Sequence, residues 1–222
     1  MNLDIEVGDT IGKVSGLLLR PPDAWATYVL AHGAGAGMRH RFMESIAQAL
    51  AERGIATLRY QFPYVEAGTR RPDPPGVLEA AVRAAVAKAR ELAPELPVVA
   101  GGKSLGGRMA SMLAAEDPEE FRAAALVFFG YPLHPPGRPD KPRVEHLAQI
   151  RVPMLFIQGT ADSLASFPMI QDVVRGLGSL ARLHVIEGGD HSFRAKGKRR
   201  PDEEIGQELG EVAATFIKEA VA

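Results

Sequence analysis

The chain has 222 residues, enough for one well-buried domain, and its acidic and basic side chains nearly cancel to a formal net charge of −1. This balance creates no overall field that would attract nucleic acid or an anionic membrane. The sequence has no cysteine, which excludes disulfides, thiolate catalysis and cysteine-ligated metal centres. The N-terminal residues lack the pattern of a secretory signal, and no apolar run approaches the roughly 20 residues that cross a bilayer, so we expect a cytoplasmic protein.

Seven short runs of apolar and β-branched residues predict strands. In chain order they are 13–20 (KVSGLLLR), 26–31 (ATYVLA), 55–60 (IATLRY), 97–101 (PVVAG), 123–129 (AAALVFF), 153–158 (PMLFIQ) and 182–187 (RLHVIE). The middle runs are almost continuously apolar, which is typical of parallel strands that are covered on both faces.

Helical patterns lie between these strands. One apolar stripe begins at Phe42, a second at Leu78, and a third follows Pro201-Asp202, which is a helix-start signal. The alternation predicts an α/β fold, a doubly wound, mostly parallel sheet with helices on both faces. We expect a single domain over residues 1–222 without a cap domain, because too few residues separate Phe129 from the next helical segment.

The segment 98–110 (VVAGGKSLGGRMA) contains Gly102-Lys103-Ser104, which ends like a phosphate-binding loop. That motif requires a glycine at position 97, where the chain has Pro97, and a strand rather than a flexible loop leads into the turn. A dinucleotide-binding motif over His32–Met38 fails as well, because Met38 stands where its third glycine belongs. Both nucleotide-binding interpretations are therefore weak.

The same segment fits G-x-S-x-G, the sharp strand-to-helix turn that presents a nucleophilic serine. Val98–Gly101 supplies the strand and Leu105–Ala115 the helix, while Gly102 and Gly106 permit close packing. Lys103, beside the serine, could steady negative charge near the site or point outward, and we expect it to point outward. A glycine-rich turn with an incidental serine is the alternative, so the interpretation depends on partners for Ser104.

A serine nucleophile needs a base, and the base needs an acid that fixes its tautomer. In this topology the order is Ser, then Asp or Glu, then His, each after a later strand. Asp162 follows the strand at 153–158 and His191 follows the strand at 182–187. The alternatives are an aspartate that caps the helix at 166–176 and a surface histidine in a glycine turn. Asp190 and Glu187 are competing acids. Asp190 adjoins His191, a spacing that seldom allows triad geometry, and Glu187 ends a strand as an ordinary surface residue would.

Attack on a carbonyl also needs donors for the oxyanion. The amide of Leu105, the residue after the serine, is one candidate, and the amide of Ala34 in the loop after the second predicted strand is the other. A mobile Gly/Ala connection is the alternative for that loop.

Taken together, AHGAGAGM, GGKSLGGRMA, GTAD and GGDHSF resemble the α/β-hydrolase superfamily, in particular its short, lidless dienelactone hydrolase-like branch. The resemblance covers essentially the whole chain. It implies Ser104 as nucleophile, Asp162 as acid, His191 as base, and the Ala34 and Leu105 amides as oxyanion donors, with no cofactor and no metal. Dienelactone hydrolases proper use a cysteine nucleophile, so lactone specificity does not carry over to a serine at position 104.

These observations predict a serine hydrolase, carboxylesterase-like, acting on a small ester-type substrate (carboxylic ester, thioester or lactone). We expect a monomer or small homo-oligomer that binds neither nucleic acid nor membranes. The short branch also resembles a subunit of a chromatin-acetylation complex, so a catalytically idle interaction or scaffold module is the alternative.

Overall fold

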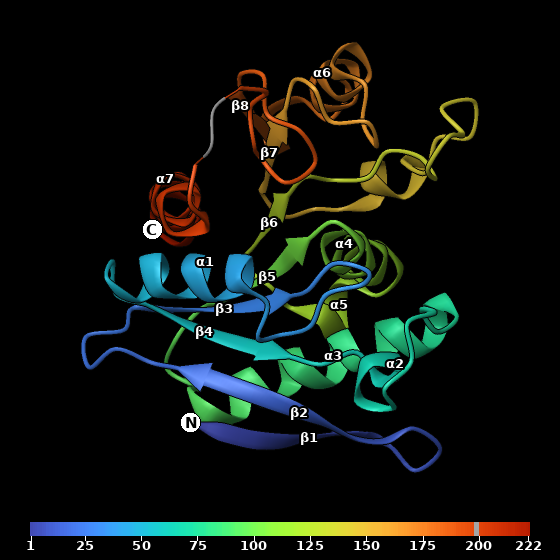
Figure 1. The fold of residues 1–222 in the computed structure, drawn as a ribbon. Coiled ribbons are helices and arrows are strands. Elements are labelled where there is room, and N and C mark those ends of the chain that lie inside the picture. The colour runs from blue at the N-terminus through green and yellow to red at the C-terminus, as the bar shows by residue number, and fades with distance from the viewer. Residues whose placement is uncertain (198–199) are drawn as a thin grey trace.

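An eight-stranded sheet forms the centre of the protein, seen here in a computed structural model that describes residues 1–197 and 200–222 (Figure 1). The strand order is β1-β2-β4-β3-β5-β6-β7-β8. The strands are β1 (Asn2–Gly8), β2 (Gly12–Leu19), β3 (Ala26–Ala31), β4 (Ile55–Tyr60), β5 (Val98–Lys103), β6 (Ala125–Phe129), β7 (Met154–Gly159) and β8 (Ala181–Ile186). The pairs β1–β2 and β2–β4 are antiparallel and the other five are parallel, which confirms the predicted fold class.

Helices connect the parallel strands and cover the sheet (Figure 1). They are α1 (Arg41–Ala51), α2 (Pro63–Glu66), α3 (Pro75–Leu92), α4 (Leu105–Glu116), α5 (Pro118–Phe121), α6 (Phe167–Gly176) and α7 (Asp202–Val221), with 3₁₀ turns η1 (Glu145–Gln149) and η2 (Gly178–Leu180). Among the residues that the structure describes, no helix is both long and apolar enough to span a membrane.

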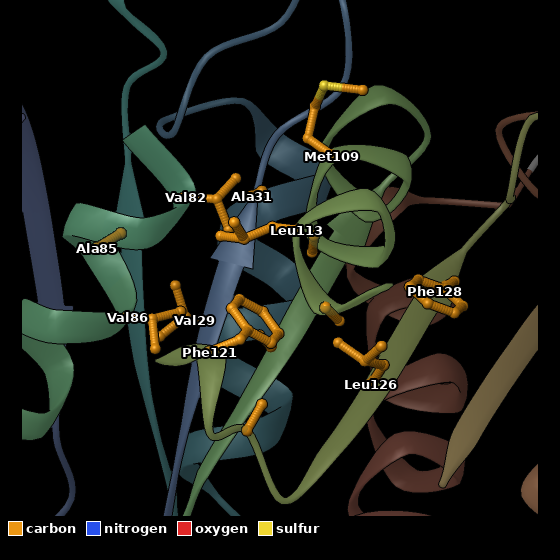
Figure 2. Close-up of a cluster of buried hydrophobic side chains, with 14 of the residues drawn as sticks. Val29, Ala31, Val82, Ala85, Val86, Met109, Leu113, Phe121, Leu126 and Phe128 are labelled. Atoms are coloured by element: carbon orange, nitrogen blue, oxygen red, sulfur yellow. The ribbon is translucent and has the colours of Figure 1, made fainter. Parts of the chain in front are cut away.

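The alternation of side chains along a strand divides the core into two layers. On β3, Tyr28 and Leu30 join the apolar cluster under α1 and α7, whereas Val29 and Ala31 join the cluster under α3 and α4. Figure 2 shows the second cluster, in which Val29 of β3 lies among side chains from α3, α4, α5 and β6. Both faces of the central strands are therefore dry, which explains why these segments are almost entirely apolar.

The edge strand β1 was not among the predicted strands. Its residues alternate, with Ile5 buried and its two neighbours exposed, and it pairs only with β2. A half-solvated edge strand lacks the continuous apolar run that marks the central strands, so its signal is much weaker.

The carboxyl ends of the central parallel strands meet at one edge of the sheet. Ala31 of β3 is in register with Gly102 of β5, and Lys103 of β5 is in register with Phe129 of β6. The loops that follow these strands are thereby brought together, as expected for a ligand-binding edge. Residues 130–144, between β6 and η1, contain neither helix nor strand, so no cap domain is inserted there.

Candidate active site

Ser104 occupies the turn between β5 and α4 by itself. Its backbone has φ +50° and ψ −114°, a conformation that costs a non-glycine residue of order 1–3 kcal/mol and persists only where the surrounding fold holds it. Gly102, two residues before Ser104, has φ +143°, and a Cβ there would lie 2.1 Å from the carbonyl oxygen of Ala31. The chain before the serine therefore packs directly against β3, and the turn places Ser104 at the end of β5. Because β5 continues to Lys103, no loop is left that would wrap a phosphate.

The structure brings the three predicted triad residues together. His191 Nε2 lies 2.8 Å from Ser104 Oγ, and His191 Nδ1 lies 2.8 Å from Asp162 Oδ2. The Asp162 side chain is fully buried, whereas that of His191 is 26% exposed. With Asp162 as acceptor, Nδ1 carries the proton and Nε2 is free to accept from the serine hydroxyl.

Further donors fix the Asp162 carboxylate. Leu164 N–H donates to Oδ1 at 2.8 Å and Gln158 Nε2 donates to Oδ2. Gln158 is fully buried, and its Oε1 accepts from Tyr131 N–H at 2.9 Å. Sequence reasoning missed Gln158, whose only signal is an amide at the end of an otherwise apolar strand.

The two competing acids are engaged elsewhere. Asp190 Oδ1 accepts from the amides of Ser192 and Arg194 at 2.7 and 3.0 Å, which shapes the turn that carries His191. Glu187 accepts from the Thr160 hydroxyl. Neither carboxylate is placed to orient the imidazole.

The loop after β3 lies against the serine. A Cβ on Gly33 would be 3.6 Å from Ser104 Cβ, and Ala34 follows directly. Within the described part of the chain, neither the Ala34 amide nor the Leu105 amide donates to a protein acceptor, and Leu105 is the first residue of α4. The Leu105 amide follows Ser104 directly at the positive end of the α4 dipole, and the Ala34 amide belongs to the loop that lies against the serine. Their role as oxyanion donors stays a prediction.

The His32 side chain fixes the start of this loop through two hydrogen bonds to the main chain. The side chain is fully buried, with Nδ1 2.8 Å from the Gly33 carbonyl oxygen and Nε2 3.1 Å from Phe62 N. Nδ1–H donates to the carbonyl and Nε2 accepts from the amide, which requires the neutral ring. Burial lowers the pKa of His32 to about 4, so the imidazole is uncharged at neutral pH and acts as a structural brace.

The aromatic side chains near the strand ends pack in the core. Tyr64, Tyr131 and Phe193 are at most 2% exposed. The Tyr131 hydroxyl lies 2.9 Å from Ser111 Oγ and 3.2 Å from His146 Nε2. Because they are buried, these side chains present little surface to a substrate.

Lys103 departs from the sequence prediction. Its side chain does not point outward but reaches across the site, where Nζ donates to the main-chain oxygen of His191 at 2.6 Å. The prediction was wrong because a side chain at a strand end has no local constraint on its direction. The space that receives it is formed by loops distant in sequence.

A mostly parallel sheet with a strained serine at its carboxyl edge, hydrogen-bonded to a histidine, defines the class of α/β-hydrolases. Residues 24–220 match the family described as Alpha/beta hydrolase domain, and the chain belongs to that family. The resemblance inferred from the four motifs is thus confirmed.

Solved structures with the same fold include a dienelactone hydrolase from Anabaena variabilis, which is 24% identical with a TM-score of 0.77 over 99% of this chain and 96% of that one. Est1E from Butyrivibrio proteoclasticus is 17% identical with a TM-score of 0.77, covering 99% and 98%. A lidless serine hydrolase from Xanthomonas campestris is 20% identical with a TM-score of 0.75, covering 97% and 94%. At these identities the likeness establishes a shared fold.

Proposed function

We propose that this protein is a serine hydrolase that cleaves small ester-type substrates, carboxylic esters first and thioesters or lactones as related cases. The observation that carries the proposal is the unbroken chain of two 2.8 Å contacts from Asp162 through His191 to Ser104. Membership of the hydrolase family supports it, and similar folds include the esterase domain of a Rhodothermus marinus protein and Est1E with ferulic acid bound.

In the proposed reaction, His191 Nε2 takes the Ser104 proton while Oγ attacks the ester carbonyl. The resulting oxyanion accepts hydrogen bonds from the Ala34 and Leu105 amides, each worth about 3 kcal/mol of barrier. His191 then protonates the leaving alcohol as the carbonyl–alkoxy bond breaks. A water molecule, deprotonated by His191, then attacks the acyl-enzyme carbonyl, and His191 returns this proton to Ser104 Oγ as the bond between Oγ and the acyl group breaks.

The absence of an inserted lid after β6 argues against an interfacial lipase. No cap domain lies between β6 and η1. The hollow of about 690 Å³ beside Pro97 and Val98 lies at the opposite end of β5 from Ser104, so it is not part of the proposed site.

The proposed mechanism requires neither a metal nor a cofactor. We further propose a cytoplasmic monomer or small homo-oligomer, and size-exclusion chromatography with light scattering tests the oligomeric part.

Labelling with a fluorophosphonate probe tests the function directly. We expect the wild-type protein to be labelled once per chain, Ser104→Ala to lose labelling, and Ser179→Ala, an exposed serine in η2, to behave as wild type. Hydrolysis of p-nitrophenyl acetate and butyrate should follow the same pattern.

A wild-type protein that is neither labelled nor active on either ester would contradict the proposal and favour an idle interaction module. Saturable ATP binding that disappears in Lys103→Ala would instead favour nucleotide binding.

A further inference from the structure

The side chain of Lys103 connects the strand that carries the serine to the loop that carries the histidine. Lys103 is the last residue of β5, directly before Ser104. Its Nζ donates to the main-chain oxygen of His191 at 2.6 Å and lies 5.4 Å from the centre of the Phe193 ring. One lysine therefore contacts the His191 loop twice, once through a carbonyl and once through an aromatic face.

A third element of the fold leaves room for this ammonium group. Gly130, the residue after β6, has φ +65°, and a Cβ there would lie 2.8 Å from Lys103 Nζ and 3.5 Å from His191 Cε1. The ammonium and the imidazole thus border the same small volume, which stays open only because residue 130 has no side chain. Ring stacking of Phe193 on Phe42 at 5.9 Å holds the other wall.

Burial and two nearby carboxylates act in opposite directions on the pKa of Lys103. Asp162, from the loop after β7, and Asp190, from the loop after β8, both raise its pKa, yet burial dominates and lowers that pKa to about 8. Gly33 and Gly130, which face it from the loops after β3 and β6, add no charge. At neutral pH the group is largely a cation, and its bond to the His191 carbonyl is charge-assisted.

A lysine at a strand end is free to extend into water. Because the Lys103 ammonium turns inward instead, its contacts with the protein have to offset the hydration that it loses. Neither nearby carboxylate receives a hydrogen bond from Nζ, because Asp162 is held by His191, Gln158 and Leu164 while Asp190 caps its own turn. Its hydrogen-bond acceptor is the carbonyl of the residue whose imidazole faces the serine.

We propose that Lys103 is a positioning residue that holds the His191 backbone and so fixes the imidazole between Ser104 and Asp162. Lys103 is bonded to Ser104 through the chain, so its contacts with the His191 loop tie the strand of the nucleophile to the loop of the base. Displacements of about 1 Å in such a constellation lower rates by up to 10²-fold. The inference rests on the proposed hydrolase function.

The first experiment compares Lys103→Met with Lys218→Met, an exposed lysine near the end of α7. Fluorophosphonate labelling at pH 7 should be at least about tenfold slower in Lys103→Met and unchanged in Lys218→Met. The wild-type rate should decline above pH 8 as the ammonium is lost, whereas the Lys103→Met rate should show no such limb. Equal rates and equal pH profiles in wild type and Lys103→Met would overturn the proposal.

Chemical rescue separates positioning from a general structural role. Because the sequence has no cysteine, Lys103→Cys introduces a single thiol, and 2-bromoethylamine converts it to an aminoethyl thioether with loss of bromide. This side chain restores an ammonium at nearly the length of lysine. We expect the modified protein to regain most of the labelling rate, and a fully modified protein that stays as slow as Lys103→Cys would contradict the proposal.

Proton NMR tests the geometry without any turnover. The hydrogen-bonded Nδ1 proton of His191 should give a far-downfield signal, assigned by its loss in His191→Asn. We expect this signal to broaden or move upfield in Lys103→Met. If the signal changes but wild type is never labelled, positioning stands and the hydrolase function fails. If the signal is unchanged, the positioning role is refuted.

Discussion

His32 makes the stability of this protein depend on pH over a defined window. The neutral imidazole is fully buried, donates to Gly33 and accepts from Phe62. Protonation would place a donor against the Phe62 amide and a charge in the core. Burial lowers the pKa of His32 from 6.5 to about 4, so the unfolded chain binds a proton at a higher pH than the folded protein. The stabilisation is complete above pH 6.5 and is lost as the pH falls towards 4.

The size of the effect follows from the gap between the two pKa values. At about 1.4 kcal/mol per pH unit, the full loss is about 3 kcal/mol, and at pH 4.5 about 2 kcal/mol has been lost. Burial also lowers the pKa of His146 to about 4, which adds a loss over the same window. A substitution is therefore needed to isolate the share of His32.

Urea denaturation of wild type and His32→Gln at pH 7 and pH 4.5 measures that share. Glutamine can keep an acceptor for the Phe62 amide but does not titrate, so the variant should lose about 2 kcal/mol less than wild type between the two pH values. His146 titrates in both proteins and cancels in the difference. If the two proteins lose the same stability, the pKa of His32 is not lowered in the folded state and the prediction is wrong.

Two further predictions concern the acid and the turn. Asp162→Asn should fold normally by circular dichroism but label about 10⁴-fold more slowly, because an amide no longer selects the reactive tautomer of His191, and a near wild-type rate would remove Asp162 from the triad. Gly102→Ala should lower the free energy of unfolding by about 3 kcal/mol or more, since its Cβ would meet the Ala31 oxygen at 2.1 Å. Gly76→Ala in α3, with nothing within 4 Å of the added Cβ, should be neutral or stabilise by up to about 1 kcal/mol, and equal stabilities of the two variants would contradict the contact.

The sequence pattern predicted the elements that bear the site, because those elements have strong local signals. The apolar runs 26–31 and 55–60 coincide with β3 and β4, and the stripe from Phe42 lies on α1. The sequence also showed that Ser104, Asp162 and His191 each follow a predicted strand, because the apolar residues of each strand mark its position. Edge strand β1 was missed, because a partly solvated strand has only a short alternation to mark it.

The same local information left the contacts of the site undecided. Whether Asp162 or a neighbouring carboxylate faces His191 depends on how the loops after β7 and β8 fold together, and the structure brings them into contact through the Ala161 amide and the Gly189 carbonyl. The role of Gln158 was equally hidden, because its partners are the main chain of Tyr131 and the side chain of Asp162.

The sequence alone determined that a serine stands in a tight strand-to-helix turn, because strand, glycines and helix start are neighbours in the chain. Only the tertiary structure decided what the lysine beside that serine does. Lys103 and His191 are 88 residues apart, and the order of the strands, together with the bare backbone of Gly130, brings the ammonium to the His191 carbonyl. Such contacts follow from packing between distant segments, which no periodicity within a single segment encodes.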